Sequence, residues 1–73
     1  MSIDPITKDL IACLDGEFVD TIKFFSIHPQ TDSIKLAIYK LRRSGYVTID
    51  EGDNRILSIA ATPKLLALAK EVR

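Results

Sequence analysis

The apolar residues in the middle of the chain recur with the period of an α-helix. Between Asp32 and Ser44 they occupy positions i, i+3, i+4 and i+7, namely Ile34, Ala37, Ile38 and Leu41. Such spacing places them on one stripe of a helix, and we expect that stripe to face the core. Gly45 follows the helical pattern and is typical of a helix end, because glycine tolerates the left-handed conformation. The sequence therefore predicts a helix over residues 32–44.

After Gly45 the apolar pattern changes to a period of two. β-branched and aromatic residues fill the segment 46–49 and recur at Ile56 and Ile59, and the polar residues 50–54 lie between the two runs. Alternation of this kind, interrupted by a polar cluster with a glycine, predicts an antiparallel hairpin.

Two further helices are expected before this region. Asp4 followed by Pro5 indicates a helix start, because the aspartate can cap free N–H groups and proline fits the first helical position. This helix should run to about Leu14, with Asp15 and Gly16 as its stop and with Ile6, Leu10, Cys13 and Leu14 inward. A second helix should run from Thr21 to about Ser26, with Asp20 or Thr21 as cap and with Ile22, Phe25 and Ile27 inward. Residues 17–19 have the composition of a short strand.

The connection 27–30 and the end of the chain complete the pattern. Pro29 biases His28 away from helical geometry, so a longer and more open connection should precede residue 32. Thr62 and Pro63 indicate the cap and first residue of a last helix that ends near Val72. Its expected inward residues are Leu65, Leu68, Ala69 and Val72.

The segment LRRSGYV, residues 41–47, resembles the end of the recognition helix in winged helix-turn-helix proteins. The following half is similar to the wing of MarR-type regulators, with Asp53, Asn54 and Arg55 at the tip and then Thr62, Pro63 and Lys64. The resemblance implies an α+β fold, a small winged helix-turn-helix with three helices, a two- or three-stranded antiparallel wing sheet and a short C-terminal helix. At 73 residues, one domain over 1–73 is expected. Leu65 stands where the MarR-type pattern usually has glycine, so an effector pocket is not implied.

The resemblance also implies a DNA-binding surface on helix 32–44 and at the wing, residues 50–55. By position, Ser33, Lys35, Leu36 and Tyr39 would lie nearest the bases in the major groove, where Leu36 is suited to a thymine methyl group. Lys40, Arg42 and Arg43 supply positive charge, with Lys40 and Arg43 on phosphates, while Gln30 and Thr31 offer hydrogen bonds at the start of the helix. Arg55 would reach the minor groove, with Asp53 orienting it. The other interpretation is that these cations only solvate a helix face.

The charge balance opens two alternatives. The chain has ten basic and ten acidic residues, and Asp50, Glu51 and Asp53 would repel phosphate near the wing. Binding could then require a homodimer, for which Ile11 and Leu66 are candidate contacts. Alternatively, the face with Leu36 and Tyr39 docks onto a protein partner and does not bind DNA.

Other functional classes find little support in the sequence. His28 is expected to be a surface residue in a turn, and Cys13 lies on an apolar stripe, so neither has the partners of a catalytic group. One cysteine and one histidine cannot supply a structural zinc site, and no phosphate-binding glycine loop occurs. We therefore expect no enzyme activity and no cofactor. A lone cysteine, with no apolar run of roughly 18 residues, also suggests a cytoplasmic protein without a membrane segment.

Overall fold

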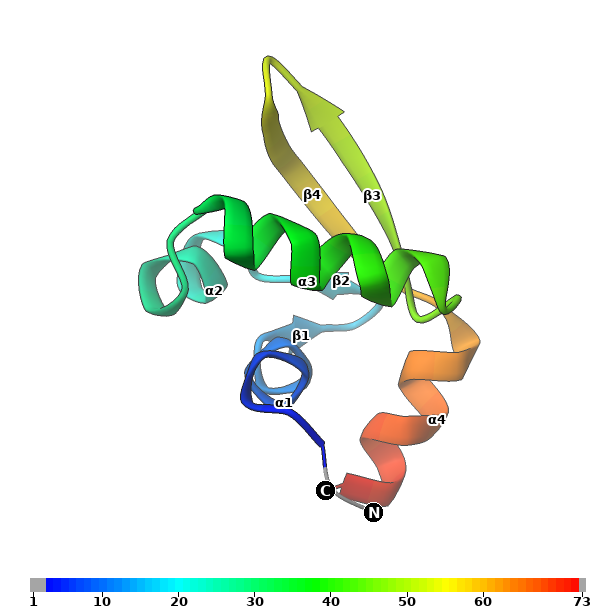
Figure 1. Cartoon of the computed structure of the whole chain (residues 1–73). Coiled ribbons are helices and arrows are strands. Elements are labelled where there is room, and N and C mark those ends of the chain that lie inside the picture. The colour runs from blue at the N-terminus through cyan, green and yellow to red at the C-terminus, as the bar shows by residue number, and fades with distance from the viewer. Residues whose placement is uncertain (1–2, 73) are drawn as a thin grey trace.

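The computed structural model describes residues 3–72, in which four helices accompany a four-stranded antiparallel sheet (Figure 1). The elements are α1 (Pro5–Ala12), β1 (Leu14–Asp15), β2 (Phe18–Val19), α2 (Thr21–Ile27), α3 (Asp32–Arg43), β3 (Val47–Gly52), β4 (Arg55–Ala61) and α4 (Pro63–Val72). The strand order is β1-β2-β4-β3, so β4 joins a short hairpin to a longer one. The predicted α+β class is confirmed.

The core lies between the helices and one face of the sheet. Its fully buried large side chains come from every helix and from both long strands, namely Leu10, Phe24, Ile38, Val47, Ile56, Ile59 and Leu65. On α3, the predicted stripe is confirmed, since Ile38 is fully buried and its three stripe neighbours are half-buried. Burial of these residues removes apolar surface from water, the main favourable contribution to folding.

The first helix ends two residues earlier than expected, and a strand takes its place. Leu14–Asp15 pairs antiparallel with Phe18–Val19 around a two-residue loop. Gly16 opens that loop with φ of +67°, as the first loop position of a type II′ hairpin turn requires. The sheet therefore has four strands, where two or three were predicted.

Ile11 is buried in α1, with only 3% of its surface exposed. The expectation that it projects outward as a dimer contact is wrong. In Figure 1, α1 lies below α3 and to the left of α4. Leu66, the other candidate dimer contact, is half-buried.

The predicted inward face of α2 is wrong for Ile22 and Ile27, although Phe25 packs against the core. Phe24 is fully buried, whereas Ile22 is 87% exposed and Ile27 is 52% exposed. Phe25 is half-buried and makes an edge-to-face contact with Phe24. Ile22 lies about 200° from Phe24 around the helix axis, so the two cannot share a face. A seven-residue helix has fewer than two turns, which leaves its apolar phase poorly defined by sequence.

The β3–β4 hairpin is longer than predicted and closes through Asp53 and Asn54 alone. These residues have φ of +49° and +63°, the left-handed pair of a type I′ turn, which matches the twist of the flanking strands. The register shifts between Asp50 and Glu51, which pair with Ser58 and Ile56, so Leu57 is the extra residue of a bulge. The hairpin tip projects beyond α3, away from α1 and α4 (Figure 1).

The last helix begins at Pro63, as predicted, and fixes the end of α3. The Thr62 hydroxyl donates to the loop between α3 and β3. It lies 2.6 Å from the Gly45 carbonyl oxygen and 2.9 Å from that of Tyr46. Lys64 donates to the Ser44 carbonyl and lies over the Tyr46 ring. Leu65 and Ala69 are buried, Leu68 is half-buried, and Val72 is exposed, contrary to expectation.

Candidate nucleic-acid interface

Local sequence fixes both ends of α3, the helix that carries most of the predicted contacts. Thr31 is the N-cap, and its hydroxyl oxygen accepts the Ile34 N–H at 3.3 Å. Three cations lie in the last turn, where they suit the negative end of the helix dipole. Gly45, with φ of +83°, ends the helix just after Ser44. A side chain predicted to contact DNA, that of Thr31, thus has a capping role.

One row of α3 contacts the β3–β4 hairpin. This hairpin-facing row is made of Lys35, Tyr39 and Arg42, whose i, i+4, i+7 spacing places them on one side of the helix. Lys35 Nζ donates to the Asn54 carbonyl at 2.6 Å, and the Tyr39 hydroxyl donates to Glu51 Oε2 at 2.6 Å. Arg42 Nη1 lies 3.3 Å from Glu51 Oε1. These contacts hold the hairpin against α3.

Glu51 is the electrostatic centre of this contact. Its carboxylate accepts from Tyr39 and Arg42, and the Arg42 guanidinium lies 5.0 Å from the centre of the Tyr39 ring. The hydrogen bond to Glu51 raises the pKa of Tyr39, and partial desolvation and the negative charge of Glu51 act in the same direction. One of the three acidic hairpin residues is therefore paired within the protein and repels a polyanion less than the sequence suggested.

Gln30 also acts inside the fold. Its side-chain amide donates from Nε2 to the Ile56 carbonyl and accepts the Ile56 N–H at Oε1, both at 2.9 Å. The amide thereby pairs with β4 as a neighbouring strand would. Both hydrogen-bonding groups of Gln30 are used, so its predicted role as a DNA contact does not follow from the structure.

A second row of α3 faces away from the hairpin and is exposed. This outer row consists of Ser33, Leu36, Lys40 and Arg43. Leu36 is 60% exposed, the largest value for an apolar side chain of α3. The row contains two cations and no acid. Of the four residues predicted to lie nearest the bases, the structure leaves Ser33 and Leu36 in this row and turns Lys35 and Tyr39 toward the hairpin.

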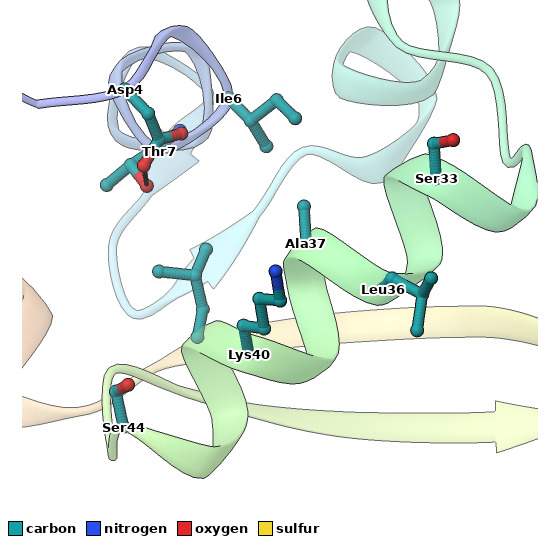
Figure 2. Close-up of a pocket in the computed structure, with 9 residues that line it drawn as sticks. Asp4, Ile6, Thr7, Ser33, Leu36, Ala37, Lys40 and Ser44 are labelled. Carbon is teal, nitrogen blue, oxygen red and sulfur yellow. Dashed lines mark hydrogen bonds between the residues drawn. The ribbon is translucent and has the colours of Figure 1, made fainter.

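A hollow of about 520 Å³ separates part of the outer row from α1. Figure 2 shows Ile6 of α1 and Ala37 of α3 pointing into it from opposite sides. Its remaining lining residues come from these two helices and their cap residues, and they are Asp4, Thr7, Ser33, Leu36, Lys40, Leu41 and Ser44. The Thr7 side chain donates to Asp4 at 2.8 Å, which closes one end of the hollow with a paired polar group.

Arg55 lies at the hairpin tip, as predicted, and its side chain is exposed. No ion pair joins it to Asp53 within residues 3–72, so the expected orientation by that carboxylate is not present. Asp53 instead forms the first position of the hairpin turn, with a positive φ of +49°. The hairpin tip is joined to α3 by the contact of Lys35 with the Asn54 carbonyl, next to Arg55 in the chain, and sequence reasoning missed this contact.

His28 and Cys13, the two residues considered for catalysis, both lie in contact with the rest of the fold. His28 is half-buried and its Nε2 lies 2.7 Å from Asp9 Oδ2, so the expectation of a surface residue is wrong. Cys13 is buried, and desolvation raises the pKa of its thiol, which disfavours the nucleophilic thiolate. Among the described side chains, no three His, Cys, Asp or Glu residues gather to hold a metal ion.

No helix in residues 3–72 is long and apolar enough to cross a membrane.

Comparison with known proteins assigns no family to this chain. No protein-family model, curated protein or solved structure matches this chain.

Proposed function

We propose that the chain is a winged helix-turn-helix domain that binds double-stranded DNA in a sequence-specific manner and regulates transcription. In this proposal α3 enters the major groove and the β3–β4 hairpin is the wing. Support comes from the element order and from the pairing of β2 with β4, which joins the second short strand to the hairpin after α3. That arrangement agrees with the fold implied by the resemblance of residues 41–64.

The observation that carries the proposal is the outer row of α3. A major groove about 12 Å wide admits one helix, and a helix in that groove needs an exposed side with hydrogen-bond donors and positive charge. Ser33, Lys40 and Arg43 supply these groups without an intervening acid. Arg55, next to Asn54 at the hairpin tip, adds a further exposed cation, and the Lys35 contact with Asn54 joins this tip to α3.

Electrostatics predict a modest and salt-sensitive affinity. The whole chain is neutral, so attraction must come from the local cations, which are Lys40 and Arg43 on α3 and Arg55 at the tip. Each cation that neutralises a phosphate releases a counterion, and the logarithm of the association constant falls with the logarithm of salt concentration by about 0.9 for each such contact.

The proposal is tested by titrating a random-sequence duplex with the protein at several salt concentrations. We expect Lys40→Ala and Arg43→Ala each to weaken binding, and Arg43→Ala, which removes a phosphate contact, to reduce the salt slope by about 1. Lys70→Ala is the matched control, because it removes the same charge from the far end of α4 and should change neither quantity. Binding that is absent at low salt, or equally affected by Lys70→Ala, would refute DNA recognition by α3.

A second function is favoured by the hollow between α1 and α3. Its apolar lining from Ile6, Ala37 and Leu41, with exposed Leu36 at its rim, would suit an apolar side chain of a protein partner. Binding of such a partner should persist at high salt and should be lost in Ala37→Arg, which fills the hollow. DNA binding has the opposite dependence on salt, so one titration series separates the two functions.

A further inference from the structure

The intramolecular contacts limit which side chains of α3 are available to read a DNA sequence. The Gln30 amide is occupied by the backbone of Ile56, and Lys35 and Tyr39 donate to the hairpin. The side chains that remain on the exposed side are those of the outer row. This row has no amide, and an amide is the group that pairs with both adenine acceptor and donor in the major groove.

Leu36 is the one apolar member of the outer row. It is 60% exposed in a helix whose other aliphatic side chains are buried or half-buried. It also stands between two hollows, one against α1 and one of about 510 Å³ formed with Tyr39, Lys40, Arg42 and Arg43. Leu36 therefore forms an apolar ridge within a surface that is otherwise polar and cationic.

The major groove presents one apolar group to such a ridge. That group is the methyl on C5 of thymine, which 5-methylcytosine also carries, whereas the other base edges present donors and acceptors. Lys40 lies one helical turn beyond Leu36, and side chains at i and i+4 are about 5–6 Å apart. This distance spans one to two base-pair steps of about 3.4 Å, so Lys40 can reach the guanine acceptors O6 and N7 close to the methyl group.

We propose that Leu36 is the specificity-determining residue of this helix and reads the C5 methyl group of a pyrimidine one or two base pairs from a guanine contacted by Lys40. The inference rests on the proposed DNA binding and makes it more specific. The expected ligand is a duplex in which a methylated pyrimidine and a guanine are near neighbours in the major groove.

The experiment begins with a duplex selected by the protein from a random pool. In that duplex each thymine is replaced in turn by deoxyuridine, which removes only the methyl group. We expect one replacement to weaken binding about fourfold, the change that corresponds to burial of one methyl group. Replacing that thymine–adenine pair by 5-methylcytosine–guanine should retain more affinity than replacing it by unmethylated cytosine–guanine.

The protein variants assign the effect to Leu36. Leu36→Ala should bind the thymine and deoxyuridine duplexes equally, because the side chain that senses the methyl group is gone. Val72→Ala is the control, since Val72 is another exposed apolar residue but lies in α4, away from the proposed DNA-binding surface, and it should retain the fourfold difference. If Leu36→Ala still discriminates, or if no deoxyuridine replacement weakens binding, the inference is wrong. In either case salt-dependent binding would remain, whereas failure of the proposed function would abolish binding to every duplex.

Discussion

Gln30 serves as a pairing partner for strand β4. Its amide makes two hydrogen bonds of 2.9 Å to Ile56, one to the N–H and one to the carbonyl oxygen. Phe18 of β2 pairs with Ala60 further along the same strand, so Gln30 satisfies a part of β4 that β2 does not reach. A single side chain thereby connects the loop before α3 to the sheet.

Replacing Gln30 tests this connection. Gln30→Ala should lower the free energy of unfolding by about 1–3 kcal/mol, because the partly buried Ile56 groups lose both partners. Gln30→Glu should be at least as destabilising, since a carboxylate cannot donate to the Ile56 carbonyl. Urea denaturation followed by circular dichroism measures both changes. Wild-type stability in these variants would show that water replaces the amide without cost.

The helices and strands differ in how well local sequence specifies them. The twelve residues of α3 repeat their apolar spacing over three turns, and the strong alternation after Gly45 marks β3, so both were predictable. In α2, four of the seven residues are aromatic or aliphatic, so the sequence does not define which of them face the core, and the inward placement of Ile22 is wrong. The strand β1 depends on pairing with β2 and has no signal in its own two residues.

The site was predicted as a helix face but not as two separate rows. The spacing of Lys35, Tyr39 and Arg42 places them together, yet sequence alone does not reveal that the hairpin covers that side. The Tyr39 contact joins residues twelve positions apart, and the Lys35 contact joins residues nineteen positions apart. Such contacts arise from tertiary packing, which also turns Gln30 toward the sheet instead of the solvent.

The start of α1 provides a prediction about pH. Burial alone would raise the pKa of Asp4, but hydrogen bonds from the Thr7 N–H and hydroxyl and from the Ile6 N–H outweigh it, so the pKa lies below its ordinary value. A depressed folded-state pKa means that the carboxylate stabilises the fold above the unfolded-state pKa of about 3.9. That contribution is lost as the pH falls through the lower, folded-state pKa.

Asp4→Asn is the variant that tests this prediction, because asparagine can still cap the helix but does not titrate. The wild-type protein should be more stable than Asp4→Asn at neutral pH, and the difference should shrink as the solution is acidified. Urea denaturation over a pH series measures it. A difference that is independent of pH would mean that the charge of Asp4 contributes nothing to the fold.

At the scale of the whole molecule, one small core supports the sheet and all four described helices. Phe24 is fully buried in this core and contacts the rings of Phe25 and His28. A chain of this size buries a smaller fraction of its surface than a larger domain does, so its net stability should be modest. Large side chains in the core then account for much of that stability.

Phe24→Ala should therefore unfold most of the protein at room temperature or on mild warming. Truncation of a buried phenylalanine costs about 3–5 kcal/mol, which approaches the whole stability of a small domain, about 5 kcal/mol at the low end. Ile22→Ala, two residues away on the exposed side of the same helix, should change stability by less than about 0.5 kcal/mol. Thermal melts of the two variants would contradict this account if their midpoints were equally lowered.

The Gln30 amide has a consequence for behaviour in concentrated solution. Unpaired backbone groups along a β-strand can template addition of another polypeptide, the first step toward ordered aggregates. Because Gln30 hydrogen-bonds both backbone groups of Ile56, an incoming chain cannot pair with β4 at that residue. Its loss should then shorten the lag before thioflavin-positive fibrils form, even under conditions in which the monomer stays folded.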